Sequence, residues 1–258
     1  SNTTGTSNTA LGSFALDANT TASNNSAFGY NSLTANTTGT RNTASGAYTL
    51  SGNTYALDAN TTASNNTAVG YASLGANTTG HSNVAIGTNA GDSNTTGNQN
   101  VFVGMNAFQG NTTAVQNTGV GDTIFNACST GTRNAGLGYE AGYNVTTGDD
   151  NTFVGTQSGY YDGSSTTNGI TTGSNNICLG SKSYPTAATV SNEITLGNAS
   201  NDNLRCADTS ISTLSDVRDK TNIADIPLGL TFLNTLRPVS FDWNTRDGSR
   251  VGRKDFGF

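Results

Sequence analysis

The side chains best suited to nucleophilic or metal chemistry are few in this chain and lie far apart. The sequence holds three cysteines, Cys128, Cys178 and Cys206, and one histidine, His81. Zinc sites need ligands at short, paired spacings, and these cysteines have none. We therefore interpret the cysteines as buried thiols and His81 as a repeat position that other units fill with threonine. No metal or cofactor site is predicted.

Three further groups suit ligand binding, but each has a simpler structural explanation. Asp149, Asp150 and Asp162 offer oxygen ligands for calcium, yet the chain lacks the glycine-rich nonapeptide of calcium-binding rolls. Asn-Thr-Thr recurs and has the form of an N-glycosylation acceptor, although turn-forming asparagine with stacked threonine explains it as well. Tyrosines such as Tyr30 and Tyr160 suit sugar platforms, and scattered surface tyrosines are the simpler interpretation.

The balance of residue types excludes several classes of protein. Gly, Thr and Asn make up 111 of the 258 residues, while 33% are hydrophobic and 11% charged. An ordinary globular domain has about 45–50% apolar residues, so a broad two-layer core is not available. Residues 1–200 carry a net charge of −6, which disfavours a nucleic-acid partner. No apolar run approaches the roughly 20 residues that cross a bilayer, so membrane insertion is not expected.

A repeat of 17 residues organises the first 200 positions. The pattern Asn-x-small-apolar-Gly begins at ten asparagines, which are Asn8, Asn25, Asn42, Asn66, Asn83, Asn100, Asn117, Asn134, Asn151 and Asn176. Successive starts are 17 residues apart, except where two units carry insertions of 7 and 8 residues. Such self-similarity predicts a repeat architecture in which each unit packs on its neighbours.

Each unit holds two short apolar segments that end at Gly or at a pair of hydroxyl residues. Seventeen residues are too few for a helical hairpin and suit one coil of a β-solenoid. The fold class is therefore all-β, a repetitive β-solenoid shaft with the form of a β-roll or a β-prism. We expect the asparagines, and the threonines, to stack on their copies in the next coil.

The core of such a shaft would be thin, because each coil offers few apolar side chains and several of them are alanine. Burial within one chain would hardly offset the backbone entropy lost on ordering each coil. Association of several chains around one axis would bury a second apolar face, and threefold closed symmetry fits a rod. The sequence thus predicts an intertwined homotrimer.

The repeats resemble two kinds of known protein. The segment Asn83-Val84-Ala85-Ile86-Gly87 and its copies are similar to the head repeats of YadA-like trimeric adhesins, which form left-handed β-rolls. They are similar also to the repetitive shafts of some bacteriophage tail fibres. The resemblance covers roughly residues 2–200 and implies a trimeric, elongated surface structure.

The composition changes after residue 200, and we expect a second domain. Residues 201–213 are interpreted as a connector and residues 214–258 as a small α+β segment. Asp225 and Pro227 favour a helix start, and Pro238 would close that helix. Val239, Phe241 and Trp243 then alternate as in a strand.

The second segment resembles the endosialidase-type intramolecular chaperone, a C-terminal trimerisation domain of phage tail spikes and fibres. The resemblance rests on Leu214-Ser215-Asp216-x-Arg218-x-Lys220-x-Asn222-Ile223, Leu233-x-x-Leu236-x-Pro238-Val239-x-Phe241-x-Trp243 and Asp255-Phe256-Gly257-Phe258. Such domains usually run further, so we expect this one to continue past residue 258.

The resemblance also implies a catalytic pair. In that family the serine and lysine of the opening motif are implicated in self-cleavage, and they match Ser215 and Lys220, with Asp216 and Arg218 in support. A nearby amine of lowered pKa can take the proton of a serine hydroxyl, which makes it a nucleophile. The expected scissile bond flanks Ser215, with Ser215-Asp216 favoured. The alternative is that these residues merely cap and ion-pair a connector.

Three functions remain open at this point. The favoured one is a structural virion protein, a trimeric phage tail fibre or spike shaft that contacts a host-surface receptor such as a glycan, with no enzyme in the shaft. It would reside in the virion and be extracellular after release. A bacterial adhesin head is the alternative, and an ice-binding solenoid is a third, since regularly spaced threonines can match a lattice.

Overall fold

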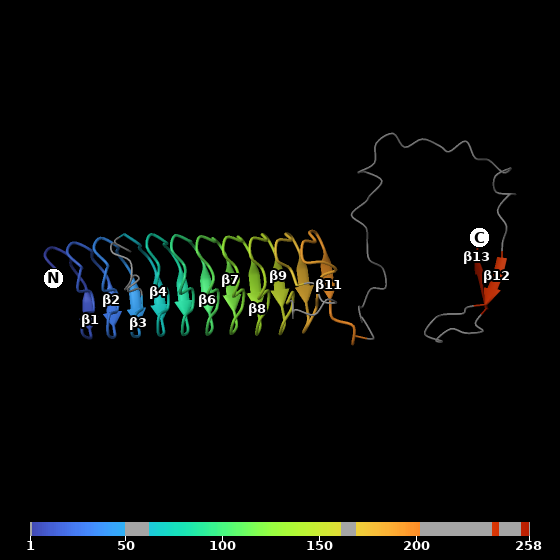
Figure 1. Ribbon diagram of the computed structural model, residues 1–258, viewed down its shortest axis with the longest axis horizontal. Coiled ribbons are helices and arrows are strands. Elements are labelled where there is room, and N and C mark those ends of the chain that lie inside the picture. Colours follow the sequence, from blue (N-terminus) through green and yellow to red (C-terminus); the bar gives the residue numbers. More distant parts are fainter. Residues whose placement is uncertain (1, 50–61, 161–168, 202–238, 243–253, 258) are drawn as a thin grey trace, which may run out of the picture. The chain divides into compact units, whose positions relative to one another are not determined.

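The structure is a computed structural model that describes residues 2–49, 62–160, 169–201, 239–242 and 254–257. The chain divides into two compact units, Ser1–Leu204 and Arg205–Phe258. In its described ranges, the first unit is a parallel β-solenoid with eleven strands and no helix (Figure 1). The predicted all-β solenoid is therefore confirmed.

Each coil contributes one strand of three residues to a single sheet. In order along the sheet, the strands are β1 (Thr9–Leu11), β2 (Ser26–Phe28), β3 (Thr43–Ser45), β4 (Thr67–Val69), β5 (Val84–Ile86), β6 (Val101–Val103), β7 (Thr118–Val120), β8 (Ala135–Leu137), β9 (Thr152–Val154), β10 (Ile177–Leu179) and β11 (Ile194–Leu196). Equivalent residues of successive repeats pair in parallel, so Ala85 lies between Ala68 and Phe102. The register also passes unchanged across both insertions, as Thr43 pairs with Thr67 and Thr152 with Ile177.

The repeat asparagine before each strand forms a buried ladder, as the sequence predicted. The Oδ1 of Asn83 accepts a hydrogen bond from the backbone N–H of Asn100 at 3.0 Å, and the Nδ2 of Asn83 donates to the carbonyl of Gly97 at 2.8 Å. Asn83 and Asn100 are fully buried. The side chain thus satisfies two backbone groups that a turn would otherwise leave unpaired inside the protein.

A second asparagine ladder donates to the same carbonyls as the first, such as that of Gly97, and ends midway along the solenoid. Asn94 donates to the Oδ1 of Asn77 at 2.8 Å, and Asn111 donates to the Oδ1 of Asn94 at 3.2 Å. In the following coils the equivalent buried positions are Cys128, Val145 and Ile170. The second ladder is therefore exchangeable for apolar side chains, whereas the first continues to Asn176.

The predicted threonine stacking is also present. Thr78, Thr95 and Thr112 each donate from Oγ1 to the backbone carbonyl of the equivalent residue in the next coil. The second residue of each pair, such as Thr79 or Thr96, is exposed. In these coils the second threonine of the pair is therefore more exposed than the first.

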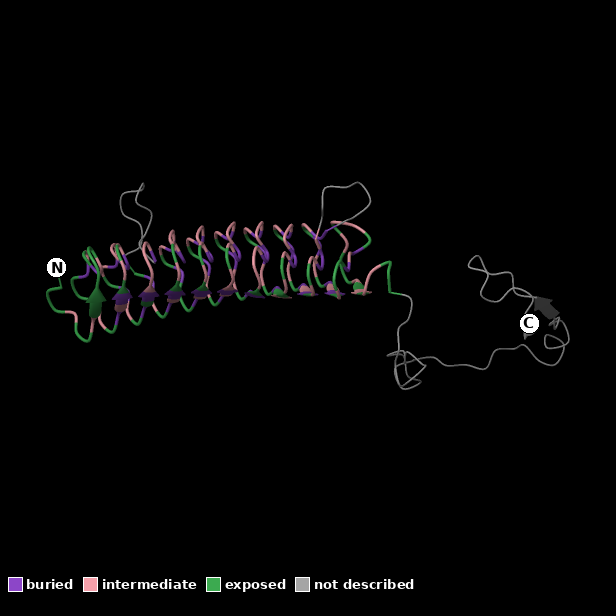
Figure 2. Cartoon of the chain, turned by 90° about the horizontal axis from the view of Figure 1, so that it is seen from below, coloured by how far each residue is buried: buried purple, intermediate pink, exposed green. Residues whose placement is uncertain are grey.

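The buried residues form a narrow core that runs along the solenoid (Figure 2). The middle residue of each strand points inward, and in the early coils it is a buried alanine such as Ala68 or Ala85. The residue six positions later completes the layer, and Leu74 and Phe108 occupy this place with less than 2% exposure. The thin core predicted from composition is thus observed.

Several corners of the coil use left-handed backbone conformations. Gly87 has φ 135°, and a Cβ there would lie 2.3 Å from the carbonyl oxygen of Gly104 in the next coil. Leu74 and Phe108 adopt φ 51° and 53°, a region that bulky residues rarely enter. Their burial holds them there, so the second apolar segment of each repeat forms a turn and not a strand.

The second unit is described only over two strands. β12 (Val239–Asp242) pairs in antiparallel fashion with β13 (Lys254–Gly257). The strand expected to start at Val239 is present, while the helix predicted between Asp225 and Pro238 lies outside the described residues.

Candidate functional site

The most extensive candidate site is the outward side of the parallel sheet, which we call the sheet face. In a strand, the first and third residues point to the same side. The first residues are Thr9, Ser26, Thr43, Thr67, Val84, Val101, Thr118, Ala135, Thr152, Ile177 and Ile194. The third residues are Leu11, Phe28, Ser45, Val69, Ile86, Val103, Val120, Leu137, Val154, Leu179 and Leu196. None of these residues is charged.

Large apolar side chains on the sheet face lie open to solvent. Nine of the third residues are between 38% and 69% exposed, and they are Leu11, Phe28, Val69, Ile86, Val120, Leu137, Val154, Leu179 and Leu196. In β6 and β9 the inward residue is Phe102 or Phe153, but most other strands place a small residue inside and a larger one outside. This is the reverse of what burial within one chain would favour, because burying an aliphatic side chain stabilises by about 1.5–3 kcal/mol.

An aromatic row borders the sheet face in the first four coils. Phe14, Tyr30, Tyr48 and Tyr71 follow their strands by two or three residues, and neighbouring rings lie 5.5–5.9 Å apart. The interplanar angles are 73–84°, so the rings pack edge to face. The row is therefore a packed ladder and not the flat platform that stacks on a sugar.

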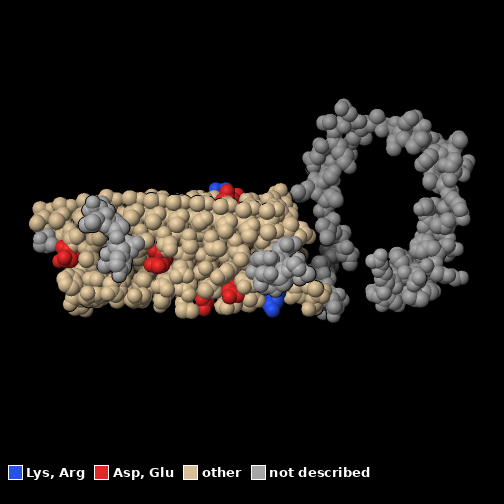
Figure 3. Space-filling model, viewed as in Figure 1, with Lys and Arg blue, Asp and Glu red and all other residues tan. Residues whose placement is uncertain are grey.

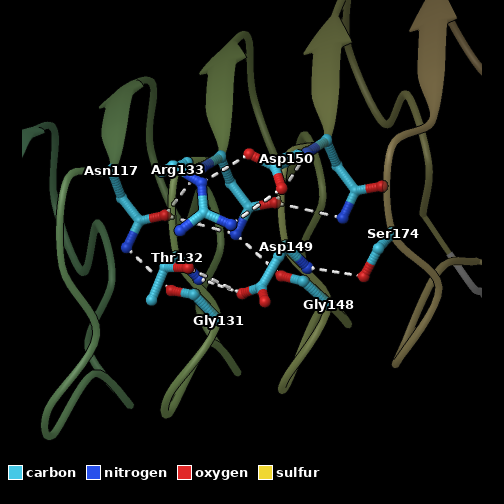
Figure 4. A network of polar contacts seen from close by, with 10 residues as sticks. Asn117, Gly131, Thr132, Arg133, Gly148, Asp149, Asp150 and Ser174 are labelled. Atoms are coloured by element: carbon cyan, nitrogen blue, oxygen red, sulfur yellow. Dashed lines mark hydrogen bonds and ion pairs between the residues drawn. The ribbon is translucent and has the colours of Figure 1, made fainter.

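A polar network lies around the start of β8 and β9 (Figure 4). Arg133 pairs with Asp150 through Nε at 2.6 Å and Nη2 at 2.8 Å. The hydrogen bond and the positive charge of Arg133 lower the pKa of the Asp150 carboxyl. Asp149 accepts bonds from the backbone N–H and the hydroxyl of Thr132, and its own N–H donates to Ser174. These contacts join equivalent positions of successive coils, so the network fixes coils to one another.

The cysteines and the histidine have no surroundings that would activate them for nucleophilic or metal chemistry. Burial raises the pKa of the Cys128 thiol to about 12 and that of Cys178 to about 11, and both are unpaired. A thiol that stays protonated is a poor nucleophile and a poor metal ligand. His81 is exposed, and its ring Nδ1 lies 3.3 Å from the Ser82 hydroxyl. The described residues hold no group of three or more histidine, cysteine or acidic side chains placed for a metal ion.

The remaining predicted site residues are distributed differently. Ser215, Asp216, Arg218 and Lys220 lie outside the described ranges, and so do Asp162 and Cys206. Asp149 and Asp150 sit in adjacent rows of one coil, where they bond to Thr132 and Arg133 and not to a shared ligand position. Across the described ranges, no helix has the length and apolar character to cross a membrane.

The sheet face was not identified from the sequence, although a signal for it exists. The alternation of a three-residue strand places the small residue on one side and the larger one on the other. Leu74, from the preceding coil, belongs to the same core as Ala85, and its side chain lies 3.2 Å from the position of a Cβ at Gly91 in the coil of Ala85. Such packing joins residues in different coils and is not visible in the strand itself.

Comparison with known families places one match at the C-terminus. The family described as chaperone of endosialidase, Peptidase_S74, matches residues 215–258. Neither the curated proteins nor the solved structures contain a match to this chain. The family match does not extend to the solenoid. Residues 215–258 carry an intramolecular-chaperone signature.

Proposed function

We propose that this protein is a trimeric, fibre-like shaft of a phage tail, a structural virion protein that takes part in host attachment. Residues 1–200 form the shaft, residues 201–213 connect, and the segment from residue 214 acts as the intramolecular chaperone. The observation that carries the proposal is the combination of an eleven-strand solenoid with a segment that matches the chaperone of endosialidase. That domain is associated with trimerisation.

A physical need links the two parts. Coils of near-identical sequence can pair one unit out of step at little cost, as slippage is weakly opposed wherever the repeated side chains are equivalent. A domain that aligns three chains at one end would remove that error. The repeats supply stiffness, while the terminal segment supplies alignment.

The oligomer is tested by light scattering on the gene's full-length product and on a chain that ends at residue 213. We expect three chains per particle for the first and a loss of soluble trimer for the second. A monodisperse single chain in the first sample would refute the trimeric shaft.

Self-cleavage by Ser215 and Lys220 is part of the proposal. Lys220 takes the proton of the Ser215 hydroxyl, the oxygen adds to the carbonyl carbon of a flanking peptide bond, and the proton passes to the leaving amine. Water then hydrolyses the ester, so the two fragments together weigh one water more than the intact chain. Asp216 and Arg218 position Lys220.

Mass spectrometry of the subunit tests this chemistry in the gene's full-length product. We expect two fragments from the natural protein and one intact mass from the Ser215→Ala and Lys220→Ala variants. An intact mass in all three proteins would refute self-cleavage and leave the shaft unaffected.

Host attachment requires a receptor, for which a surface glycan is the proposed class. Binding of the fluorescent trimer to bacterial cells, before and after removal of their surface glycans, measures it. Binding that is unchanged by glycan removal would refute this receptor class.

A further inference from the structure

The sheet face is an apolar surface of the solenoid for which the described residues supply no cover. Its eleven strands, spaced about 4.8 Å apart, span roughly 48 Å. With a width of about 10 Å, the face covers roughly 500 Å², which matches the largest apolar patches of soluble monomers.

We propose that the sheet face is the surface through which three copies of this chain pack along a common axis. The number three rests on the proposed function, whereas the choice of surface rests on the residues described here. Three such faces together amount to about 1,500 Å², within the range of specific protein interfaces.

The distribution of charge supports this choice. The face carries no charged residue over eleven strands, while the charged side chains of the solenoid lie elsewhere on the coil. In the view of Figure 3, charged atoms form small separate groups on a largely neutral surface. Charge depletion at the centre of a surface patch is typical of interface cores.

The placement of the insertions supports it as well. Both insertions fall after the strand of their coil, because the extra residues lie between Ser45 of β3 and Asn66, and between Val154 of β9 and Asn176. The strands on either side keep their register. The sheet face therefore continues without interruption past both insertions, as a face that packs along its whole length requires.

The face also favours one alignment of the chains. Around a threefold axis, each residue meets its own copies, so Ser45 would meet Ser45 and Phe28 would meet Phe28. A shift by one coil would bring Ser45 against Phe28 or Val69 and leave its hydroxyl facing apolar groups. The sheet face thus adds to the alignment that the C-terminal segment begins.

A matched pair of substitutions in one coil tests the surface. Ile86 is 41% exposed on the face, and Thr96 is exposed on another row of the same coil. In the full chain, Thr96→Asp should keep the three-chain mass by light scattering, while Ile86→Asp should lower the mass threefold with its β circular dichroism retained. An unchanged mass for Ile86→Asp would overturn the inference and leave the trimer standing.

A second pair covers the case in which Ile86→Asp fails to fold. The background is a Cys206→Ser chain, whose remaining thiols Cys128 and Cys178 are buried. In this background, a short bismaleimide should cross-link subunits that carry Val120→Cys on the sheet face. It should not cross-link subunits that carry the control Thr130→Cys. Absence of cross-linking at Val120→Cys in a chain of three-copy mass would overturn the proposed surface. A two-chain mass would overturn the threefold packing, and a single-chain mass would refute the proposed function with it.

Discussion

The coils before and after residue 91 fill the same solenoid in opposite ways. In the early coils, alanine occupies the strand centre and leucine the opposing turn, as in Ala68 and Leu74. In the later coils, four phenylalanines fill the core, and glycines occupy the places beside them. These phenylalanines are Phe102, Phe108, Phe125 and Phe153, with adjoining rings 4.7–5.7 Å apart. The side-chain volume of the core is therefore kept nearly constant when neighbouring coils are taken together, although the residue at a given repeat position changes in size.

The outside of the solenoid changes at the same place. The early coils carry the aromatic row, which runs from Phe14 to Tyr71, and their cores contain no aromatic ring within the described residues. The later coils place phenylalanines in the core, while Tyr139 stays exposed and Tyr143 packs edge to face against Tyr160 with ring centroids 5.6 Å apart. The same coil backbone thus accommodates aromatic rings either on its outer surface or in its core. Where the rings lie in the core, the neighbouring core positions hold smaller residues such as glycine.

The largest expected effect is the removal of a core ring from the later coils. The ring of Phe125 packs against Gly136 and Gly142, where a Cβ would lie only 2.5 Å from it. Because these neighbours have no side chain, they cannot fill the cavity that removal of the ring would leave. Phe125→Ala should lower the free energy of unfolding by about 3–5 kcal/mol, and Leu33→Ala by about 2–3 kcal/mol. Urea titration followed by circular dichroism measures both, and an equal or larger loss for Leu33→Ala would contradict the comparison.

A substitution that imposes the early core on a later coil should cost less. In Gly91→Leu, the new side chain meets Phe102, whose ring lies 2.5 Å from the position of a Cβ. We expect a loss of about 1–3 kcal/mol from overpacking. Adding Phe102→Ala recreates the alanine and leucine pair and should recover most of the loss, measured as a double-mutant cycle in urea. Additive losses would show that volume is not exchanged between these coils.

Both asparagine ladders should be sensitive to a single valine. Asn83→Val leaves the N–H of Asn100 without its acceptor, which costs about 2 kcal/mol. Asn94→Val should also cost about 2 kcal/mol, because it leaves the Oδ1 of Asn77 and the Nδ2 of Asn111 without their partners, although the carbonyl of Gly97 still receives the Nδ2 of Asn83. Thermal unfolding measures both variants, and a negligible loss for Asn94→Val would contradict this expectation.

The smallest effect concerns the equivalent arginines Arg41 and Arg133. Arg41 donates to the neutral Asn65 at 2.7 Å, whereas Arg133 pairs with Asp150. Because the folded protein lowers the pKa of Asp150 below its usual 3.8, the pair stabilises above that pH, and its contribution disappears as the pH falls through the lowered pKa. The melting-temperature loss of Arg133→Gln should therefore shrink on acidification.

Arg41→Gln provides the control for this titration, since its acceptor carries no charge. Its loss of melting temperature should be the same at about pH 7 and about pH 2. Equal pH dependence in the two variants would mean that the Asp150 carboxyl does not contribute through its ionisation.

The repeat made most of the solenoid predictable. The spacing of the asparagines indicated the coil length, the coil class and the ladder, because a side chain repeated at one place in every coil must meet its own copy. The turn around Leu74 was not predictable in the same way. A leucine at φ 51° contradicts its local preference, and only the contacts of a neighbouring coil hold it there.

The candidate surface was harder to predict than the fold. The sequence indicated that a second apolar face should exist, but the residues Ile86 and Val120 look like core residues when the strand is considered alone. Their outward direction depends on which side the preceding coil covers. Ser215 and Lys220 stay a prediction that rests on the matched family and on the chemistry of the pair.

Glu193 occupies the place of the repeat asparagine in the last coil and ends its ladder. Its N–H donates to the Oδ1 of Asn176, but its carboxylate turns to the N–H and hydroxyl of Thr186. Glu193 thus acts as a cap on the ladder: its N–H binds the last amide oxygen, and its side chain has no amide N–H to donate onward. The asparagine ladder therefore ends in the coil of β11, and extending this ladder by one coil would need an amide at position 193.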